Sequence, residues 1–215
     1  MRKVLDVLRN FWKDWYVGIL IIVVFLVIKQ FVVMPYKFTG DSMCDTFNFF
    51  DGECVKERSI KGEYGLVNRF IYLFSEPKRG DVIVFDVKGY GKYVKRVIAL
   101  PGEKVNLRDG EVYITLTDGQ EIKLDESSYL NEENNHNTQP WMERTTYFEV
   151  PEKGYFLMGD NRPESADSRA CFIYDKQGCF ERKKQYYAKK SDIVGRVDAV
   201  VWPVSELRKV KEIEY

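Results

Sequence analysis

Histidine is almost absent from this chain, which has 215 residues and one His, at position 136. A Ser-His-Asp or Cys-His catalytic apparatus needs a histidine base, so either would have to use His136. That residue lies in the polar, asparagine-rich stretch from Asn131 to Asn137, which is typical of a solvated loop. The sequence therefore disfavours histidine-dependent hydrolases.

Metal-ligand patterns and an excess of charge are lacking as well. Neither His-Glu-x-x-His nor Cys-x-x-Cys occurs. The 33 Lys and Arg residues balance 33 Asp and Glu residues, and there is no basic stripe or helix-turn-helix pattern. We therefore expect no metal ion, no other cofactor and no nucleic acid as the main partner.

Cysteine is scarce, and the four residues fall into two local pairs, Cys44 with Cys54 and Cys171 with Cys179. An even number outside the cytoplasm permits disulfide bonds, although four cysteines allow three pairings. Reduced cysteines that pack as small apolar side chains remain the alternative. The close spacing of Cys171 and Cys179 motivates the hypothesis of a disulfide between them.

One long apolar segment is present, near the N-terminus. Residues 17–28 carry no polar side chain. Counted from Trp15 to Met34, with Lys29 directed toward an interface, the segment reaches the roughly 20 residues that span a bilayer. No small-x-small cleavage site follows, which favours an uncleaved signal anchor over a secretory signal or a buried soluble helix. Pro35 is expected to end this transmembrane helix.

Flanking charges predict the orientation of the segment. Positive side chains precede it at Arg2, Lys3, Arg9 and Lys13. The positive-inside rule then places residues 1–14 in the cytoplasm and the chain after Met34 outside. We predict a single-pass protein of the cell membrane, with an anchor in residues 1–35 and an extracytoplasmic domain in residues 36–215.

Short strands separated by glycine and aspartate turns dominate that domain. Residues 82–87 and 93–99 are predicted strands, joined by a hairpin at Gly89 and Gly91, and residues 193–202 form a late strand. Residues of about 106–150 differ in composition and predict an inserted β-rich subdomain. The predicted fold is mostly β, with an antiparallel sheet or a barrel-like arrangement.

Lys95 lies in an apolar setting within the strand that ends at Pro101-Gly102. Because strand residues alternate, Lys95 shares a face with Tyr93 and Val97, and Arg96 points the other way. Burial on that face would lower the pKa of Lys95 from about 10.4 and make the amine a possible base. A lysine that extends to the solvent is the commoner alternative.

Three stretches resemble, in order and spacing, the motifs of type I signal peptidases. Ser42-Met43 begins the serine motif shortly after the apolar segment, and Lys95-Arg96-Val97 through Pro101-Gly102-Glu103 matches the lysine motif. Gly159 through Arg169 matches the Gly-Asp-Asn-Arg-x-x-Ser-x-Asp-Ser-Arg block without a gap. Taken singly, Ser42 could be an ordinary turn serine and the last run a solvated loop.

The resemblance implies acyl transfer by a Ser-Lys dyad, in which Ser42 is the nucleophile and Lys95 the base. It also implies an oxyanion hole formed by backbone N–H groups, chiefly that of Ser42, next to Gly40. Ser165 would orient the lysine amine. The same resemblance makes Asp167 and Arg169 a structural pair near the site and has Asp160 and Arg162 shape the loop.

The resemblance further implies the substrates, which are secretory preproteins whose signal peptides have small residues before the cut. A substrate bound as an extended strand near a lipid bilayer suits this role. The sequence departs from the family at Cys44-Asp45-Thr46-Phe47, where relatives have x-Pro-Thr-Leu. Loss of that proline removes a fixed φ and puts the rigidity of the loop in doubt.

Two rival functions remain open at this stage. The first is a narrow-scope processing peptidase of the same family, of the conjugative-transfer type, which the altered serine motif keeps possible. The second is a catalytically silent, membrane-anchored β domain that acts as a binding module. The presence of both Ser42 and Lys95 argues against the second, and peptide cleavage distinguishes them.

Overall fold

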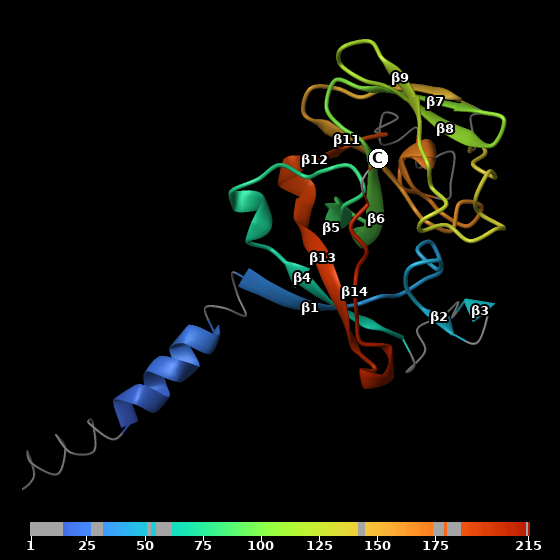
Figure 1. Cartoon of the computed structure of the whole chain (residues 1–215). Helices are drawn as coiled ribbons and strands as arrows, with labels where there is room; N and C mark the ends of the chain where they lie inside the picture. Colours follow the sequence, from blue (N-terminus) through green and yellow to red (C-terminus); the bar gives the residue numbers. More distant parts are fainter. Residues whose placement is uncertain are drawn as a thin grey trace, which may run out of the picture.

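The computed structural model describes residues 15–26, 32–50, 53–54, 62–141, 145–173, 179, 186–213 and 215. Residues 15–26 form an α-helix, and most other elements are strands (Figure 1). The strands are β1 (Val33–Lys37), β2 (Phe49–Phe50), β3 (Glu53–Cys54), β4 (Tyr64–Asn68), β5 (Val82–Val87), β6 (Gly91–Ala99), β7 (Lys104–Arg108), β8 (Glu111–Thr115), β9 (Glu121–Lys123), β10 (Tyr147–Glu149), β11 (Gly154–Met158), β12 (Ala188–Lys189), β13 (Ile193–Trp202) and β14 (Arg208–Lys209). Short 3-10 helices are η2 (Ile71–Leu73), η3 (Ser168–Ala170), η4 (Lys190–Asp192) and η5 (Val204–Glu206).

The main sheet has the strand order β1-β4-β13-β5-β6-β11-β12, with β14 paired to β13. All of its pairs are antiparallel. The expected strands at residues 82–87 and 193–202 are present as β5 and β13. The mostly β, antiparallel fold class is therefore confirmed.

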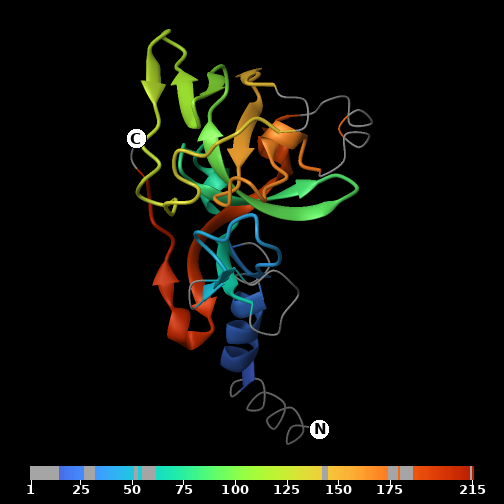
Figure 2. The same ribbon diagram turned by 90° about the vertical axis from the view of Figure 1, so that its right-hand side faces the viewer.

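A second sheet, with the order β10-β7-β8-β9, covers one end of the main sheet (Figures 1 and 2). Its side chains Val105 and Ile114 pack on Ile98 and Phe156 of the main sheet in one buried cluster. Burying such aliphatic and aromatic side chains contributes about 1.5–3 kcal/mol each. The strands β7 to β10 lie largely within the region whose composition predicts an insertion.

The N-terminal helix prediction was wrong at its C-terminal end. We expected a helix from Trp15 to Met34, ended by Pro35, but Val33–Lys37 form β1 and pair along their length with β4. An apolar run rich in valine does not distinguish a strand from a helix. Pro35 is tolerated because β1 is an edge strand of the main sheet.

The apolar helix at residues 15–26 exposes its side chains along its whole length. It lies at the end of the molecule opposite the second sheet (Figure 2). Among the helices that the structure describes, none has both the length and the apolar character to cross a membrane. Residues 1–14 and 27–31, which belong to the predicted anchor, lie outside the described residues.

Candidate active site

Strand β6 places the side chain of Lys95 against the turn that carries Ser42. Lys95 pairs with Ile83 of β5, and its side chain is only 1% exposed. The Lys95 Nζ atom lies 2.5 Å from Ser42 Oγ and donates to Val94 O at 3.0 Å. The two residues that sequence motifs single out, 53 positions apart, are therefore in direct contact.

Burial lowers the pKa of the Lys95 amine to about 8. The carboxylates of Asp167, Asp160 and Asp41 oppose this change, since a nearby negative charge favours the protonated amine. Desolvation outweighs them, and the direction agrees with the sequence-based expectation. An amine with such a pKa is partly neutral near pH 7 to 8 and can accept a proton.

The backbone of Ser42 rests on the block of residues 159–169. Its carbonyl oxygen accepts a hydrogen bond from Asn161 N at 3.1 Å. A Cβ atom on Gly159 would lie 2.3 Å from that oxygen and 2.2 Å from Ser165 Oγ, so only glycine fits between them. Gly40, two residues before Ser42, has a φ of +85°. Gly159 thus brings Ser42 and Ser165 together, and Gly40 precedes Ser42 in the turn.

Ser165 is fully buried beside Gly159, but its expected hydrogen bond to the lysine is not formed. Among the described residues, its hydroxyl makes no hydrogen bond to the Lys95 amine. The hydroxyl instead contributes to lowering the pKa of the Asp167 carboxyl. The position of Ser165 agrees with the expected site, whereas its orienting role stays a prediction.

Three buried ion pairs form the interior of the 159–169 block. Asp167 pairs with Arg169 as expected, at 2.8 Å. Burial raises the pKa of the Asp167 carboxyl, but Arg169 outweighs this effect and holds the pKa below its usual value. Breaking such a buried pair costs about 3–5 kcal/mol, because it leaves one charge unpaired.

The other two pairs reach partners outside the block. Asp160 pairs with Arg96 of β6 at 2.7 Å, and Arg162 pairs with Glu126 at 2.5 Å. The sequence analysis placed Arg96 in the lysine motif but did not predict its partner, and it gave Glu126 no role, because no local pattern identifies a distant ion-pair partner. Alternation in β6 was the one available signal, since it directs Arg96 away from Lys95.

Each residue of the stretch Cys44 to Phe47, which stands where the family has x-Pro-Thr-Leu, has a contact of its own. Cys44 forms a disulfide with Cys54, and Thr46 donates a hydrogen bond to Asp160. The ring of Phe47 stacks on Phe38 with centroids 3.9 Å apart. These contacts hold the turn in the absence of the proline, and the effect of the altered stretch on its rigidity stays a prediction.

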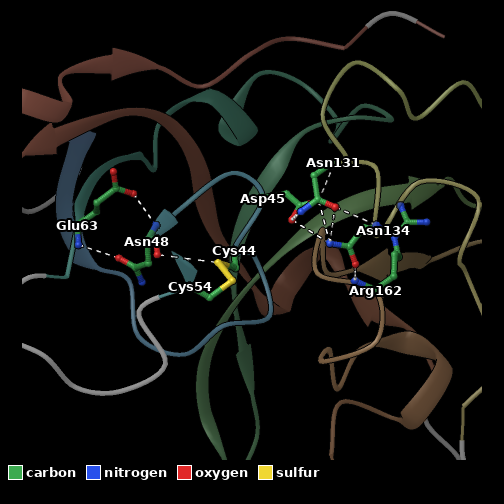
Figure 3. Close-up of a disulfide and its surroundings, with 8 residues drawn as sticks. All are labelled: Cys44, Asp45, Asn48, Cys54, Glu63, Asn131, Asn134 and Arg162. Carbon is green, nitrogen blue, oxygen red and sulfur yellow. Dashed lines mark hydrogen bonds between the residues drawn. A yellow bond between two sulfur atoms is a disulfide. The ribbon is translucent and has the colours of Figure 1, made fainter. Parts of the chain in front are cut away.

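Both local cysteine pairs form disulfides. The hypothesis of a Cys171–Cys179 bond is confirmed, and the Cys44–Cys54 bond joins the Ser42 turn to β3 (Figure 3). Asn48 closes the same turn, because its backbone N–H donates to Glu63 while its side chain accepts from Glu63 N, both at 2.8 Å. The turn is thus held on one side by Cys54 and Glu63.

A cleft of about 280 Å³ opens beside Ser42 and Lys95. Tyr36, Phe38 and residues 92–95 are among its lining residues, and Tyr36 Oη donates to Lys92 O at 3.0 Å. Strand β1 is an edge strand, and β6 pairs with β11 only from Arg96 onward. The cleft therefore lies next to backbone edges to which an extended peptide could bind.

The remaining titratable groups offer no competing centre in the described residues. His136 lies at the surface, with its Nδ1 atom 2.6 Å from Glu111 Oε1. Over those same residues, no group of three or more His, Cys, Asp or Glu side chains could hold a metal ion. The arrangement at Ser42 and Lys95 is suited to nucleophilic attack on a carbonyl group.

Comparison with known proteins gives a consistent result. The family model described as signal peptidase, peptidase S26, matches residues 12–202. Signal peptidase I P of Bacillus subtilis subsp. natto is 34% identical over 203 residues, covering 92% of each chain. Signal peptidase I of Bacillus licheniformis is 32% identical over 208 residues, covering 94% of each chain.

A solved structure is also similar. The crystal structure of a signal peptidase I from Enterococcus faecalis V583 has a TM-score of 0.38 and 28% sequence identity. The match covers 57% of this chain and 97% of that chain.

Proposed function

This chain belongs to the signal peptidase family, peptidase S26, and is a serine peptidase, and we propose that it cleaves signal peptides with a Ser42–Lys95 dyad while anchored in the cell membrane. The observation that carries the proposal is the 2.5 Å contact between Ser42 Oγ and Lys95 Nζ. A buried amine with a pKa of about 8 supports it.

The chemistry begins with neutral Lys95. Its amine accepts the proton of Ser42 Oγ as that oxygen attacks the scissile carbonyl carbon. The tetrahedral intermediate then collapses, and the lysine gives the proton to the departing amine, which leaves an acyl-enzyme. In the second half, Lys95 takes a proton from a water molecule, the hydroxide attacks the ester, and Ser42 regains its proton.

Backbone N–H groups stabilise the developing oxyanion in this mechanism. The N–H of Ser42 is the main donor, and the positive φ of Gly40 shapes the backbone leading to it. Donors held in place before the reaction lower its barrier because they need no reorganisation. Ser165 orients the amine of Lys95 once a substrate excludes water from the cleft.

The substrates are secretory preproteins bound as extended strands. The cleft beside the free edges of β1 and β6 takes a peptide main chain, and its volume of about 280 Å³ suits small side chains such as alanine. Preproteins present such residues before the cut. The partners are therefore secretory preproteins and the bilayer that holds their apolar segments.

Anchoring in the cell membrane depends on the apolar segment. Residues 17–28 lack polar side chains, and positive residues precede them, which supports a cytoplasmic N-terminus. The proposed peptidase domain comprises residues 36–215, and its first strand, β1, begins three residues earlier, at Val33. Its catalytic cleft lies outside the cytoplasm, with the insertion at about residues 106–150.

Cleavage of a preprotein by the detergent-solubilised full chain tests the proposal. Incubation should release one signal peptide, cut after a small residue, and Ser42→Ala should release none. Mass spectrometry of the products locates the cut. A wild-type enzyme that leaves a panel of preproteins intact would favour the silent binding module, whereas cleavage of one member alone would favour a narrow-scope peptidase.

A further inference from the structure

Asp45, three residues after Ser42, joins the nucleophile turn to the turn that begins at Asn131 (Figure 3). One carboxylate oxygen accepts from Asn131 N at 2.8 Å, and the other accepts from Asn131 Nδ2 at 3.0 Å. Asn134 Nδ2 lies 2.9 and 3.1 Å from the two oxygens. Three N–H donor groups therefore converge on one carboxylate from a segment 86 to 89 positions away.

The contact continues back to the nucleophile. Asn134 is only 5% exposed, and its Oδ1 atom accepts from Arg162 N at 2.8 Å. The preceding residue, Asn161, donates to the carbonyl oxygen of Ser42 at 3.1 Å. Ser42, Asp45, Asn134 and residues 161–162 thus form a closed ring of covalent and hydrogen bonds, which we name the Asp45 clamp.

We propose that Asp45 is a positioning residue, which holds Ser42 against Lys95 through the Asp45 clamp and does so only when its carboxylate is ionised. The inference deepens the proposed function and rests on it. Asp45 stands within the stretch where this chain departs from the family's proline-containing consensus. A carboxylate clamp therefore takes the place of a proline in fixing the turn.

Ionisation matters because every group bonded to the carboxylate is a donor. A proton on either oxygen displaces an N–H group, since a protonated carboxyl must itself donate. Burial raises the pKa of Asp45 to about 6; Asp160 adds to this effect, whereas Asn131, Asn134 and Arg162 oppose it. The carboxylates that line the neighbouring cavity are Glu53, Glu133 and Glu164.

The clamp predicts a second step in the pH dependence of cleavage. Protonation of Lys95 lowers the rate below about pH 8. Below about pH 6 the carboxyl of Asp45 also gains its proton, so the Ser42 turn loosens and kcat falls further. Tyr36 and residues 92–95, which also line the cleft, take no part in the clamp, so KM should change less than kcat.

The test compares the pH dependence of kcat for three enzymes: the wild type, Asp45→Asn and the control Asp118→Asn. The Asp45→Asn substitution keeps the shape of the side chain but removes its negative charge. The control removes a carboxylate that accepts Gln120 N at 2.9 Å in an exposed turn. We expect Asp45→Asn to lower kcat roughly 10- to 100-fold at pH 8, as a misplaced nucleophile does. It should also lack the step near pH 6, whereas Asp118→Asn should keep both.

A second variant keeps the test decisive if Asp45→Asn does not fold. Asn134→Ala removes a donor that stabilises the carboxylate, so it should lower kcat and move the step near pH 6 to higher pH. A purely structural role would lower the melting temperature without moving that step. The proposal would be overturned if a folded Asp45→Asn enzyme had the same kcat as Asp118→Asn and kept both steps of the pH profile. It would also be overturned if the step near pH 6 stayed at the same pH in Asn134→Ala.

The two levels of inference fail in different ways. If wild-type enzyme leaves preproteins uncut, the proposed function itself is wrong. If wild-type enzyme cuts them and the Asp45 variants match it at every pH, only the clamp is wrong.

Discussion

At the scale of single residues, the site depends on a lysine that the fold keeps out of water. Lys95 shares its face of β6 with apolar side chains and is 1% exposed, so desolvation lowers its pKa despite three nearby carboxylates. Arg96, the next residue, is equally buried, but its guanidinium stays charged and Asp160 compensates that charge. Two adjacent cations therefore take opposite roles, one as a base and one as a fixed charge.

Substitution of Lys95 separates the need for a base from the need for a charge. Lys95→Arg should abolish cleavage, because guanidinium does not lose its proton at working pH. For the wild type, the rate should rise about tenfold per pH unit below about pH 8 and level off above it, since the neutral amine is the active form. Single-turnover assays over pH 6 to 9 would measure both.

Lys123→Arg is the matched control, because Lys123 pairs with Glu111 at an exposed site in the second sheet. It should keep wild-type turnover and the same pH profile. Near-normal turnover by a folded Lys95→Arg enzyme would exclude lysine as the base.

Gly159 offers a second test at this scale. Gly159→Ala should lower kcat roughly tenfold or more, because the new Cβ would collide with the carbonyl oxygen of Ser42 and with Ser165 Oγ. Overpacking should also reduce the free energy of unfolding by about 1–3 kcal/mol. Kinetics and thermal melting measure the two effects.

Gly119→Ala is the control for Gly159, since it lies in an exposed hairpin where a Cβ meets nothing within 4 Å. Its positive φ makes alanine mildly unfavourable there, but cleavage should be unchanged. Equal kinetics for the two variants would contradict the close packing of Gly159 against Ser42.

At the scale of elements, the Ser42 turn is held by a disulfide on one side and by the Asp45 clamp on the other (Figure 3). Closing a loop of ten residues contributes about 2–3 kcal/mol in the chain-entropy description. The disulfide therefore contributes to stability and restrains the nucleophile at the same time.

Removing the two disulfides separately should distinguish these effects. Replacing Cys44 and Cys54 by alanine should lower both the melting temperature and kcat, because the turn gains freedom. Replacing Cys171 and Cys179 should lower the melting temperature and leave kcat nearer to that of the wild type. Thiol labelling of denatured, unreduced wild-type protein should find no free cysteine. Labelling of both cysteines of a pair would contradict the disulfide of that pair.

Sequence patterns predicted the strands around Lys95 well, because alternation and turn residues are local signals. They misassigned Val33 and Met34 to a helix, since apolar runs fit a strand or a helix and only pairing with β4 decides. The bond from Asn131 to Asp45 spans 86 positions and that from Arg162 to Glu126 spans 36. No local sequence pattern indicates such distant contacts. The hydrogen bonds and ion pairs that hold the site in place could therefore be identified only from the structure.

At the scale of the whole molecule, the apolar helix at residues 15–26 and the second sheet lie at opposite ends of the main sheet (Figure 2). The proposed topology, with a cytoplasmic N-terminus, predicts that protease added to intact spheroplasts digests the chain after β1 and spares only a short N-terminal fragment. Immunoblotting for tags at both ends would measure this. Protection of the full-length chain would contradict the topology.

The bonds of Asp45 to Asn131 and Asn134, and of Arg162 to Glu126, have a consequence for protein engineering. The partners Asn131, Asn134 and Glu126 all lie in the middle of the chain, within the stretch of about residues 106–150 whose composition predicts an insertion. A minimal enzyme made by excising that stretch would lose the side chains that bind Asp45 and Arg162 near its nucleophile. An exchange of the stretch between relatives should therefore include residues 44–47, which supply Asp45.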